Sequence, residues 1–258
     1  MIYKVENLSF KYPNSKQLFN NISFDIEEGQ LYTILGKNGV GKTTLFNCML
    51  NFNKKYEGNI FVNNANIKSL KEKELAKIVS FVPQNSNCSF DYLVSEYILM
   101  GCASNVSLFS SPSINDKEKV DKVLNDLEIT NLKDKKFNEL SGGEQQLVLI
   151  ARAIVCNPKI IFFDEPTSHL DYENQIKVLR IINNLKTKGY SLVITTHDPN
   201  QALLLKGDAI LFNNNCSIIK GGVEKILTKE NLQKVFGKEL EIKYLEEYKR
   251  NCVIYPSL

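Results

Sequence analysis

The sequence predicts an α/β fold with a mixed sheet, an antiparallel β part and a separate helical part. Three observations lead to this prediction. Near the start of the chain, short stretches rich in Phe, Ile and Tyr alternate with turns, as β strands do. From about residue 85, amphipathic helical patterns replace them. Later, "IIFF" at 160–163 and "LVITT" at 192–196 are uninterrupted runs of the kind found in buried parallel strands.

The first 84 residues are expected to be mostly strand. The stretches "YKVENLSFKY", "NISFDIEEG" and "QLYTILG" are short, are bounded by turns and have strand composition. A glycine-rich loop follows the third of them, and "KTTLFNCMLNF" after the loop has helical spacing. Two more strands are expected at "YEGNIFVNN" and "KIVSFVPQ".

Residues 85–137 are expected to form a helical insertion. Its helices are "DYLVSEYILMG" and "DKEKVDKVLNDLEI", with the Ser-rich loop 103–115 between them. The next helix, "EQQLVLIARAIVC", is apolar on nearly every side and is therefore expected to be buried. The run at 160–163, the amphipathic helix "QIKVLRIINNLKTKG", the run at 192–196 and a hairpin over 208–222 follow, and 223–258 mixes helical and extended pieces.

Composition limits the class of protein. The 258 residues are 43% hydrophobic, which suits one globular unit of one or two subdomains. A net charge of +3 from 32 basic and 29 acidic residues is too even to favour nucleic acid as a partner. We expect neither a secretory leader nor a membrane span, because no apolar run is long enough. The six cysteines are scattered, which favours free thiols in a reducing compartment. With only two histidines, a His-rich metal site is not expected.

The glycine-rich loop "GKNGVGKTT" fits the phosphate-loop pattern G-x-x-x-x-G-K-[ST]. Its glycines let the backbone wrap around phosphates, so that successive N–H groups form an anion nest. Lys42 is expected to reach the β- and γ-phosphates, and the Thr43 hydroxyl suits Mg²⁺. A chance glycine-rich turn is the alternative, but the flanking strand and helix are the context that the pattern requires. The predicted nucleotide site consists of Gly36, Lys37, Asn38, Gly39, Val40, Gly41, Lys42, Thr43 and Thr44.

Polar residues follow three other predicted strands. Asp164 and Glu165 come directly after "IIFF". Beside a phosphate loop, the first can hold Mg²⁺ through water and the second can act as a general base, whereas an acidic turn closed by Pro166 is the alternative. His197 follows "LVITT" and is a candidate hydrogen-bond donor to the γ-phosphate, or otherwise a helix cap. Gln84 ends "IVSFVPQ" and can reach Mg²⁺ or the attacking water.

A second candidate anion site lies about a hundred residues after the first. The stretch "NELSGGEQQ" puts a serine and two glycines at the start of a predicted helix. Free backbone N–H groups at such a helix start attract anions. One chain therefore contains two candidate phosphate sites far apart in sequence.

Together these stretches resemble the ATP-binding subunit of an ABC transporter, in the family's order and over nearly the whole chain. "GKNGVGKTT" resembles the Walker A loop and "IIFFDEP" resembles Walker B with its catalytic glutamate. Gln84 matches the Q-loop glutamine and His197 the switch histidine. Tyr12 stands where the family has an aromatic residue that stacks on adenine, although an ordinary strand aromatic is the alternative. "LSGGE" matches the ABC signature and "SHLD" the D-loop, and these stretches contribute Leu140, Ser141, Gly142, Gly143, Glu144, Ser168 and Asp171.

The resemblance implies a P-loop NTPase core with a mixed sheet, an antiparallel β subdomain and a helical ABC-specific subdomain. In this single domain of residues 1–258, segments 1–84 and 138–222 would form the core and the β subdomain, 85–137 the helical subdomain and 223–258 a short C-terminal extension. The resemblance also implies hydrolysis of ATP, with Mg²⁺ held by Thr43, Gln84 and Asp164. The active form would be a homodimer, or a pair with a near-identical subunit, in which each signature meets the ATP of the other chain.

A finer resemblance points to importers of iron–siderophore, haem or cobalamin compounds. "DEPTSHLDYENQ", "THDPNQAL", "LVSEYILMG" and the tail "VEKILTKENLQKVFG" are similar to that group, whereas loop 103–115 departs from it. The implied partners are integral membrane permease subunits, contacted through the helical subdomain at the cytoplasmic face of the membrane, and indirectly a substrate-binding protein. The alternative is a soluble ABC ATPase without a permease, such as one that assists iron–sulfur assembly. A DNA-repair ATPase would have long coiled coils and an exporter usually a fused membrane domain, and the sequence has neither.

Overall fold

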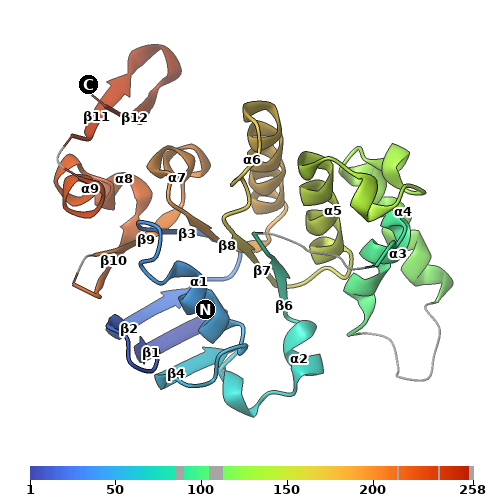
Figure 1. The fold of residues 1–258 in the computed structure, drawn as a ribbon, viewed down its shortest axis with the longest axis horizontal. Helices are drawn as coiled ribbons and strands as arrows, with labels where there is room; N and C mark the ends of the chain where they lie inside the picture. The colour runs from blue at the N-terminus through green and yellow to red at the C-terminus, as the bar shows by residue number, and fades with distance from the viewer. Residues whose placement is uncertain (85–89, 105–112, 214, 238, 256–258) are drawn as a thin grey trace. The chain divides into compact units, whose positions relative to one another are not determined.

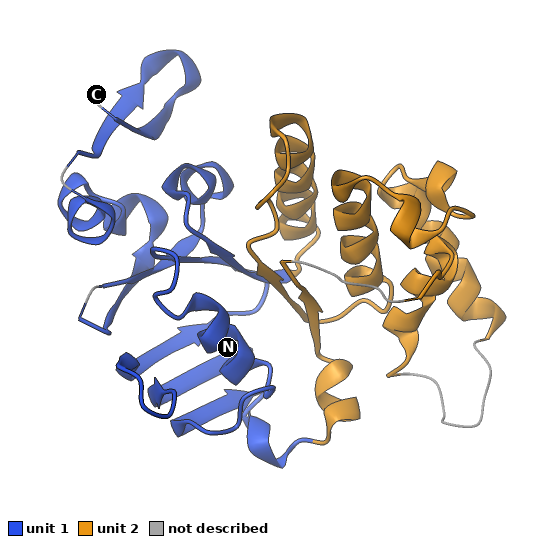
Figure 2. Cartoon of the chain, in the orientation of Figure 1, with its two compact units in different colours: residues 1–70, 191–258 blue, residues 71–190 orange. Residues whose placement is uncertain are grey.

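The computed structural model describes residues 1–84, 90–104, 113–213, 215–237 and 239–255. The chain divides into two compact units, one made of residues 1–70 and 191–258 and the other of residues 71–190 (Figures 1 and 2). The first unit is discontinuous in sequence because the strand that starts at residue 191 pairs with the strand that starts at residue 31.

The first unit contains the predicted antiparallel sheet. Strand β1 lies between β2 and β4 and pairs antiparallel with both, and the short strand β5 completes the order β2-β1-β4-β5. Its apolar side chains are buried on one face, as the alternating pattern predicts. The bounds are β1 (Tyr3–Lys11), β2 (Gln17–Ile26), β4 (Glu57–Val62) and β5 (Ala65–Asn66).

A second sheet of this unit positions the glycine loop. Strand β3 lies between β8 and β9, parallel to both, and β10 is antiparallel to β9, so the predicted mixed sheet and hairpin are confirmed. Every residue of β3 and β8 is buried, which explains why neither alternates in sequence. The bounds are β3 (Leu31–Leu35), α1 (Lys42–Met49), β8 (Ser191–Thr196), α7 (Pro199–Leu205), β9 (Asp208–Phe212) and β10 (Ile218–Gly222).

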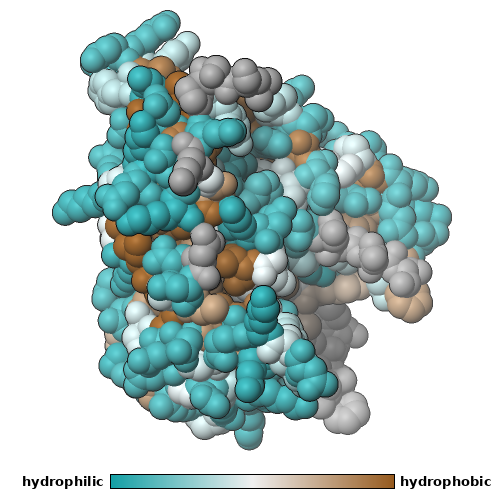
Figure 3. Space-filling view, turned by 60° about the vertical axis from the view of Figure 1, so that its left-hand side comes forward, coloured by the Kyte–Doolittle hydropathy of each residue, from teal (hydrophilic) through white to brown (hydrophobic). Residues whose placement is uncertain are grey.

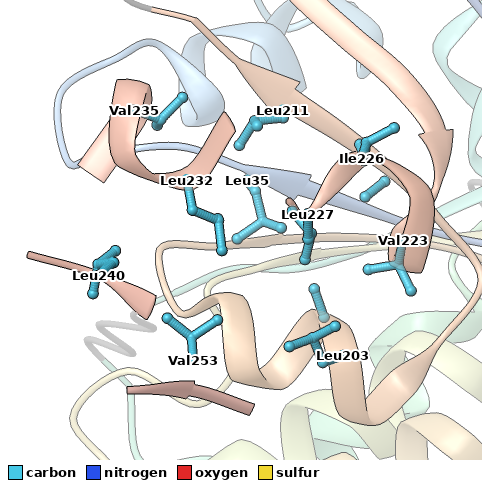
Figure 4. Packing of buried hydrophobic residues seen from close by; sticks show 12 residues of the cluster. Leu35, Leu203, Leu211, Val223, Ile226, Leu227, Leu232, Val235, Leu240 and Val253 are labelled. Carbon is cyan, nitrogen blue, oxygen red and sulfur yellow. The ribbon is translucent and has the colours of Figure 1, made fainter. Parts of the chain in front are cut away.

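The C-terminal segment packs onto this second sheet and mixes helix and strand, as expected. Its side chains join a buried apolar cluster with residues of β3, α7 and β9 (Figure 4). Val253 and Leu240, both from the last stretch of chain, belong to that cluster. The bounds are α8 (Val223–Ile226), α9 (Lys229–Phe236), β11 (Glu241–Leu245), the 3₁₀ turn η5 (Glu246–Tyr248) and β12 (Arg250–Ile254).

The second unit combines a parallel strand pair with a helical layer. β6 pairs parallel with β7, and helix α5 packs against α3, α4 and α6. The apolar residues all round α5 are explained by this packing, because most of its side chains are buried. The bounds are α2 (Glu72–Ala76), β6 (Val79–Val82), α3 (Val94–Leu99), α4 (Ile114–Asp126), α5 (Gly142–Ile154), β7 (Ile160–Asp164) and α6 (Tyr172–Thr187). The 3₁₀ turns are η1 (Ile67–Ser69) in the first unit and η2 (Met100–Cys102), η3 (Thr130–Leu132) and η4 (Phe137–Glu139) in the second.

Two helices differ from the sequence expectations, and two stretches of the expected helical insertion and loop lie outside the described residues. Helix α2 was not expected, because five residues are too few to establish a helical period. Helix α4 begins at Ile114, inside the expected loop 103–115, because the Ser113 hydroxyl accepts a hydrogen bond from the Asp116 N–H and so caps the helix. Residues 105–112 of that loop and residues 85–89 of the helical insertion lie outside the described residues.

The described part of the chain contains no helix of the length and apolarity needed to cross a membrane. The face of the molecule drawn in Figure 3 is mainly hydrophilic, with smaller hydrophobic areas between polar side chains.

Candidate functional site

The glycine loop joins the end of β3 to the start of α1, as the sequence predicts. Gly36 lies where no side chain fits, since a Cβ there would be 2.8 Å from Cγ1 of Val40 and 3.1 Å from Cβ of Phe212. Gly39 and Gly41 have φ of +79° and +108°, which side chains strongly disfavour. The loop therefore needs glycine at these three positions for steric reasons within the chain.

Lys42 closes this loop from inside. Its side chain is only 5% exposed, and its Nζ atom donates to the carbonyl oxygens of Gly36 at 3.0 Å and Lys37 at 3.2 Å. The ammonium group is thus fixed at the loop, next to the first backbone N–H groups of α1, where the helix dipole also favours an anion. Gly41 caps α1 without a side-chain hydrogen bond. This combination is suited to binding phosphate.

Tyr12 lies beside the same helix. Its Oη atom is 3.3 Å from Oγ1 of Thr44, and its ring meets the Phe10 ring edge-on at 4.9 Å between centroids. The side chain is 44% exposed and borders a pocket of about 720 Å³, together with Asn53 and Lys55. A flat ring held in this way leaves room for a planar group to stack on it.

The pairing of β3 with β8 places His197 near the glycine loop. Leu35 of β3 pairs with Thr196 of β8, so the residues that follow, Gly36 and His197, leave two adjacent parallel strands at the same edge. His197 is exposed and lines a pocket of about 660 Å³ together with Lys37. The predicted rim position of His197 is therefore observed within the first unit.

The turn after His197 is closed by hydrogen bonds. The Asp198 N–H donates to Oγ1 of Thr196 at 3.1 Å, and the Asp198 carboxylate accepts from the Asn200 N–H at 2.8 Å, which caps α7. Asp198, rather than His197, is thus the helix cap. This removes the alternative function considered for the histidine.

In the second unit, the acidic pair lies at the end of β7. Asp164 is 3% exposed, and Glu165 has the left-handed φ of 43°. The backbone N–H and the hydroxyl of Ser168 both donate to the Glu165 carbonyl oxygen, at 3.0 and 2.8 Å. The chain therefore leaves β7 through a turn at Glu165, which these two hydrogen bonds close.

Gln84 comes to the same sheet edge as the acidic pair. Val82 of β6 pairs with Phe163 of β7 in a parallel register. Gln84 follows the end of β6 by two residues, and Asp164 is the last residue of β7. Because the two strands are parallel, these residues, which are far apart in sequence, leave the sheet at the same edge.

The second candidate anion site is the start of α5. Ser141 and Glu144 form a capping box, in which the Ser141 N–H and hydroxyl each donate to Oε2 of Glu144 at 2.9 Å, and the Glu144 N–H donates to the Ser141 hydroxyl oxygen at 3.4 Å. The Ser141 backbone and hydroxyl hydrogen bonds hold the pKa of Glu144 below its usual value. Leu140 is buried directly before the cap. Gly142 and Gly143 provide the first helical N–H groups, which have no partner within a helix.

The D-loop residues form the start of α6. The Asp171 carboxylate accepts hydrogen bonds from the backbone N–H of Asn174 at 2.8 Å and from its Nδ2 at 2.9 Å. These bonds hold the pKa of Asp171 below its usual value. Asn174 and Asn200 could not be singled out from the sequence, since a lone asparagine near a helix start is usually a surface residue.

The predicted residues therefore fall into two sets. Within the first unit, Tyr12 and His197 both lie near the glycine loop. Within the second unit, Gln84 and the acidic pair lie at one sheet edge, and the start of the signature helix packs against the first turn of α6. Among the described residues, no group of three or more His, Cys, Asp or Glu side chains is arranged to hold a metal ion by itself.

A glycine loop with this geometry, between a buried parallel strand and a helix, defines a nucleotide-binding α/β protein of the P-loop class. The chain belongs to the ABC transporter family, whose model matches residues 19–168, more than half of the chain. It is the ATP-binding subunit of such a transporter and hydrolyses ATP. The resemblance noted in the sequence, and the fold class that it implied, are confirmed.

Similar proteins cover almost the whole chain. The molybdate import ATP-binding protein MolC of Haemophilus influenzae is 36% identical over 259 residues, which cover 98% of this chain and 97% of that protein. The probable iron chelatin transport ATP-binding protein of Helicobacter pylori strain 26695 is 33% identical over 243 residues, covering 93% and 95%. A solved metal-chelate type ABC transporter in an inward-facing conformation has a TM-score of 0.86 at 32% identity, with 99% of this chain and 97% of that chain covered.

Proposed function

We propose that this subunit acts as a dimer that binds two ATP molecules between two chains and powers the import of a metal compound. The observation that supports the dimer is that one chain has two helix starts suited to binding an anion, one at α1 and one at α5. Each ATP would contact the glycine loop of one chain and Ser141, Gly142 and Gly143 of the other. Each nucleotide is then bound by two sites, the glycine loop of one chain and the signature of the other.

In the proposed site, the glycine loop and Lys42 bind the phosphates. Lys42 donates to two loop carbonyls, which holds its ammonium group at the loop, where it would also contact the phosphate oxygens of ATP. Tyr12 would stack on the adenine, consistent with its exposed ring beside the pocket at Asn53. These residues would determine affinity for ATP rather than the rate of hydrolysis.

The donor set suits Mg²⁺. Thr43 offers a hydroxyl oxygen, Gln84 an amide oxygen and Asp164 a buried carboxylate, and hard oxygen donors of this kind are those Mg²⁺ prefers. When bound, the ion would neutralise negative charge on the phosphate oxygens. The three residues would hold it together with the phosphates of ATP.

Hydrolysis is assigned to groups at the strand ends. Glu165 would accept a proton from water as that water attacks the γ-phosphorus, and the bond to the bridging oxygen of ADP would break. Gln84 would orient the water, and His197 would donate a hydrogen bond to the γ-phosphate. The Ser168 hydroxyl, which donates to the Glu165 carbonyl oxygen, would hold the backbone of this residue in place.

The transported cargo is proposed to be a metal chelate or oxyanion of the kind carried by the relatives. One relative is named for molybdate import and another for iron chelatin transport, and the similar solved structure is of metal-chelate type, each similar over nearly its full length. Within this class, iron–siderophore, haem or cobalamin-type chelates are the cargo that the sequence favours. The helical layer around α3 would dock on permease subunits at the cytoplasmic face of the membrane, and a substrate-binding protein would deliver the cargo.

The alternative is a soluble ABC ATPase without a permease, since it would use the same ATP site. Co-purification from membranes separates the two: the transport proposal expects a multi-span permease to accompany the tagged protein. Its consistent absence from solubilised membranes would favour the soluble alternative.

The catalytic assignment is tested with Glu165→Gln, which removes the proton acceptor and keeps the size. We expect ATP hydrolysis to fall by at least about a hundredfold, the effect of losing a general base, while ATP still binds and holds two chains together. Turnover and size-exclusion chromatography with ATP measure both effects. Glu118→Gln, on the exposed side of α4, is the matched control, and undiminished turnover in Glu165→Gln would refute the role.

A further inference from the structure

The two signature glycines have different surroundings. A Cβ on Gly142 would meet no heavy atom within 4 Å among the described residues. A Cβ on Gly143 would lie 2.4 Å from Cγ, 2.5 Å from Oδ1 and 2.6 Å from Nδ2 of Asn174. Neither glycine has the positive φ that would require glycine for backbone reasons. Only Gly143 is therefore constrained to be glycine from within the chain, and the constraint comes from one side chain.

That side chain is not free to move away. Asn174 lies in the first turn of α6, where its backbone N–H and Nδ2 both donate to the carboxylate of Asp171. Rotating the Asn174 amide away from α5 would break the second of these bonds. The side chain of Asn174 is therefore held in place by the D-loop aspartate while its outer face touches the signature helix.

We propose that Asn174 is a positioning residue for ATP hydrolysis, which fixes the start of the signature helix α5 against the D-loop at the start of α6. This inference rests on the proposed trans ATP site. In that site the N–H groups of Gly142 and Gly143 must meet a phosphate of the other chain, so an error in their position costs activity. Asn174 touches no nucleotide. It acts by holding the start of α5 and the D-loop in a fixed position relative to each other, and both segments are predicted to face the other chain.

The contact also explains why the helix starts so close to α6. With glycine at 143 the Asn174 amide packs directly against the helix backbone, and any side chain there would force the two helices apart. The atoms that a Cβ on Gly143 would strike are the three that an Asn174→Ala substitution removes. The structure therefore predicts that one substitution compensates for the other.

The test is a double-mutant cycle with Gly143→Ala, Asn174→Ala and the combined variant, assayed for ATP turnover and for nucleotide binding by the isolated protein at low concentration. We expect Gly143→Ala to lower kcat by about tenfold or more and Asn174→Ala by about threefold, with no change in nucleotide affinity at low protein concentration. The combined variant should recover to within about twofold of Asn174→Ala, because alanine then fits the vacated space. Asn183→Ala, an exposed asparagine of the same helix, is the control and should leave turnover unchanged.

Two outcomes would overturn the inference, and they are distinguishable. If Gly143→Ala loses turnover and Asn174→Ala does not relieve the loss, the methyl group clashes with the nucleotide or the other chain, and Asn174 has no positioning role although the trans site stands. If neither Gly143→Ala nor Gly142→Ala affects turnover, the signature does not contact ATP, and the trans site fails together with the inference. A drop in nucleotide affinity for Asn174→Ala alone would also count against positioning through α5.

Discussion

The side-chain amide of Asn200 forms two hydrogen bonds with the backbone of Val253, which lies 53 residues later in the sequence, on β12. Its Nδ2 atom donates to the Val253 carbonyl oxygen at 3.1 Å, and its Oδ1 atom accepts from the Val253 N–H at 2.8 Å. Asn200, three residues after His197, thus links the start of α7 to β12 by hydrogen bonds. The C-terminal hairpin is therefore joined to the segment that contains His197.

We expect Asn200→Ala to detach β12 from α7 and to destabilise the protein by about 1–3 kcal/mol, because the two Val253 groups lose their partner. Hydrogen exchange of the Val253 amide should accelerate more than exchange within β3 or β8. Asn200→Asp keeps the acceptor and loses the donor, so its effect should be intermediate. Equal exchange of Val253 in the alanine variant and the parent protein would contradict this account.

Tyr12 offers a test of base stacking. Tyr12→Ala should raise the KM for ATP by about 5- to 150-fold, since stacking of a base on an aromatic ring contributes about 1–3 kcal/mol. Tyr12→Phe removes only the contact between Oη and Oγ1 of Thr44, so we expect a change of less than about threefold. Steady-state kinetics with ATP and GTP should show parallel losses, because both bases have a flat face. An equally large effect of the phenylalanine variant would assign the role to the hydroxyl group instead.

Gly101 fixes the helical layer of the second unit. A Cβ there would be 2.2 Å from the carbonyl oxygen of Arg152 and 2.6 Å from Cγ1 of Val155, both on or next to the end of α5. Gly101→Ala should therefore lower the free energy of unfolding by about 1–3 kcal/mol, as overpacking does. Gly142→Ala, with open space around its Cβ, is the matched control for thermal unfolding and should not lower the Tm. Adding Val155→Ala should not restore Gly101→Ala, because the closer contact is with main chain.

The capping box of α5 should make stability depend on pH. The pKa of Glu144 is lowered by its hydrogen bonds from Ser141, so its contribution is complete above the usual value of 4.5 and is lost as the pH falls through the lower folded-state value. The stability difference between the parent protein and Glu144→Gln should be constant between pH 7 and about 5.5 and should shrink below about 4.5. Urea denaturation at several pH values measures it, with Glu118→Gln as the control for loss of one charge. A difference that grows on acidification would have the wrong sign.

Much of the site could be predicted because its chemistry depends on local patterns. The glycine loop between a strand and a helix, the acids after an apolar run, and the serine and two glycines before a helix each involve a few consecutive residues, and each lies on the predicted element. Helix α2 escaped prediction because five residues do not establish a period. The choice between His197 as a helix cap and as a rim residue also stayed open, since it depends on which neighbouring side chain reaches the α7 N–H groups.

The sequence by itself determined the order of elements, the residue types at the nucleotide site and the family, since these depend on local pattern and spacing. Only the tertiary structure decided which residues meet. The register of β3 with β8 places Gly36 and His197 at one sheet edge, and the pairing of β6 with β7 does the same for Gln84 and the acidic pair. The packing of Asn174 on Gly143 and the bonds of Asn200 to Val253 were also decided there. Such contacts join residues that are distant in sequence, and their geometry comes from strand pairing and helix packing, which no local pattern encodes.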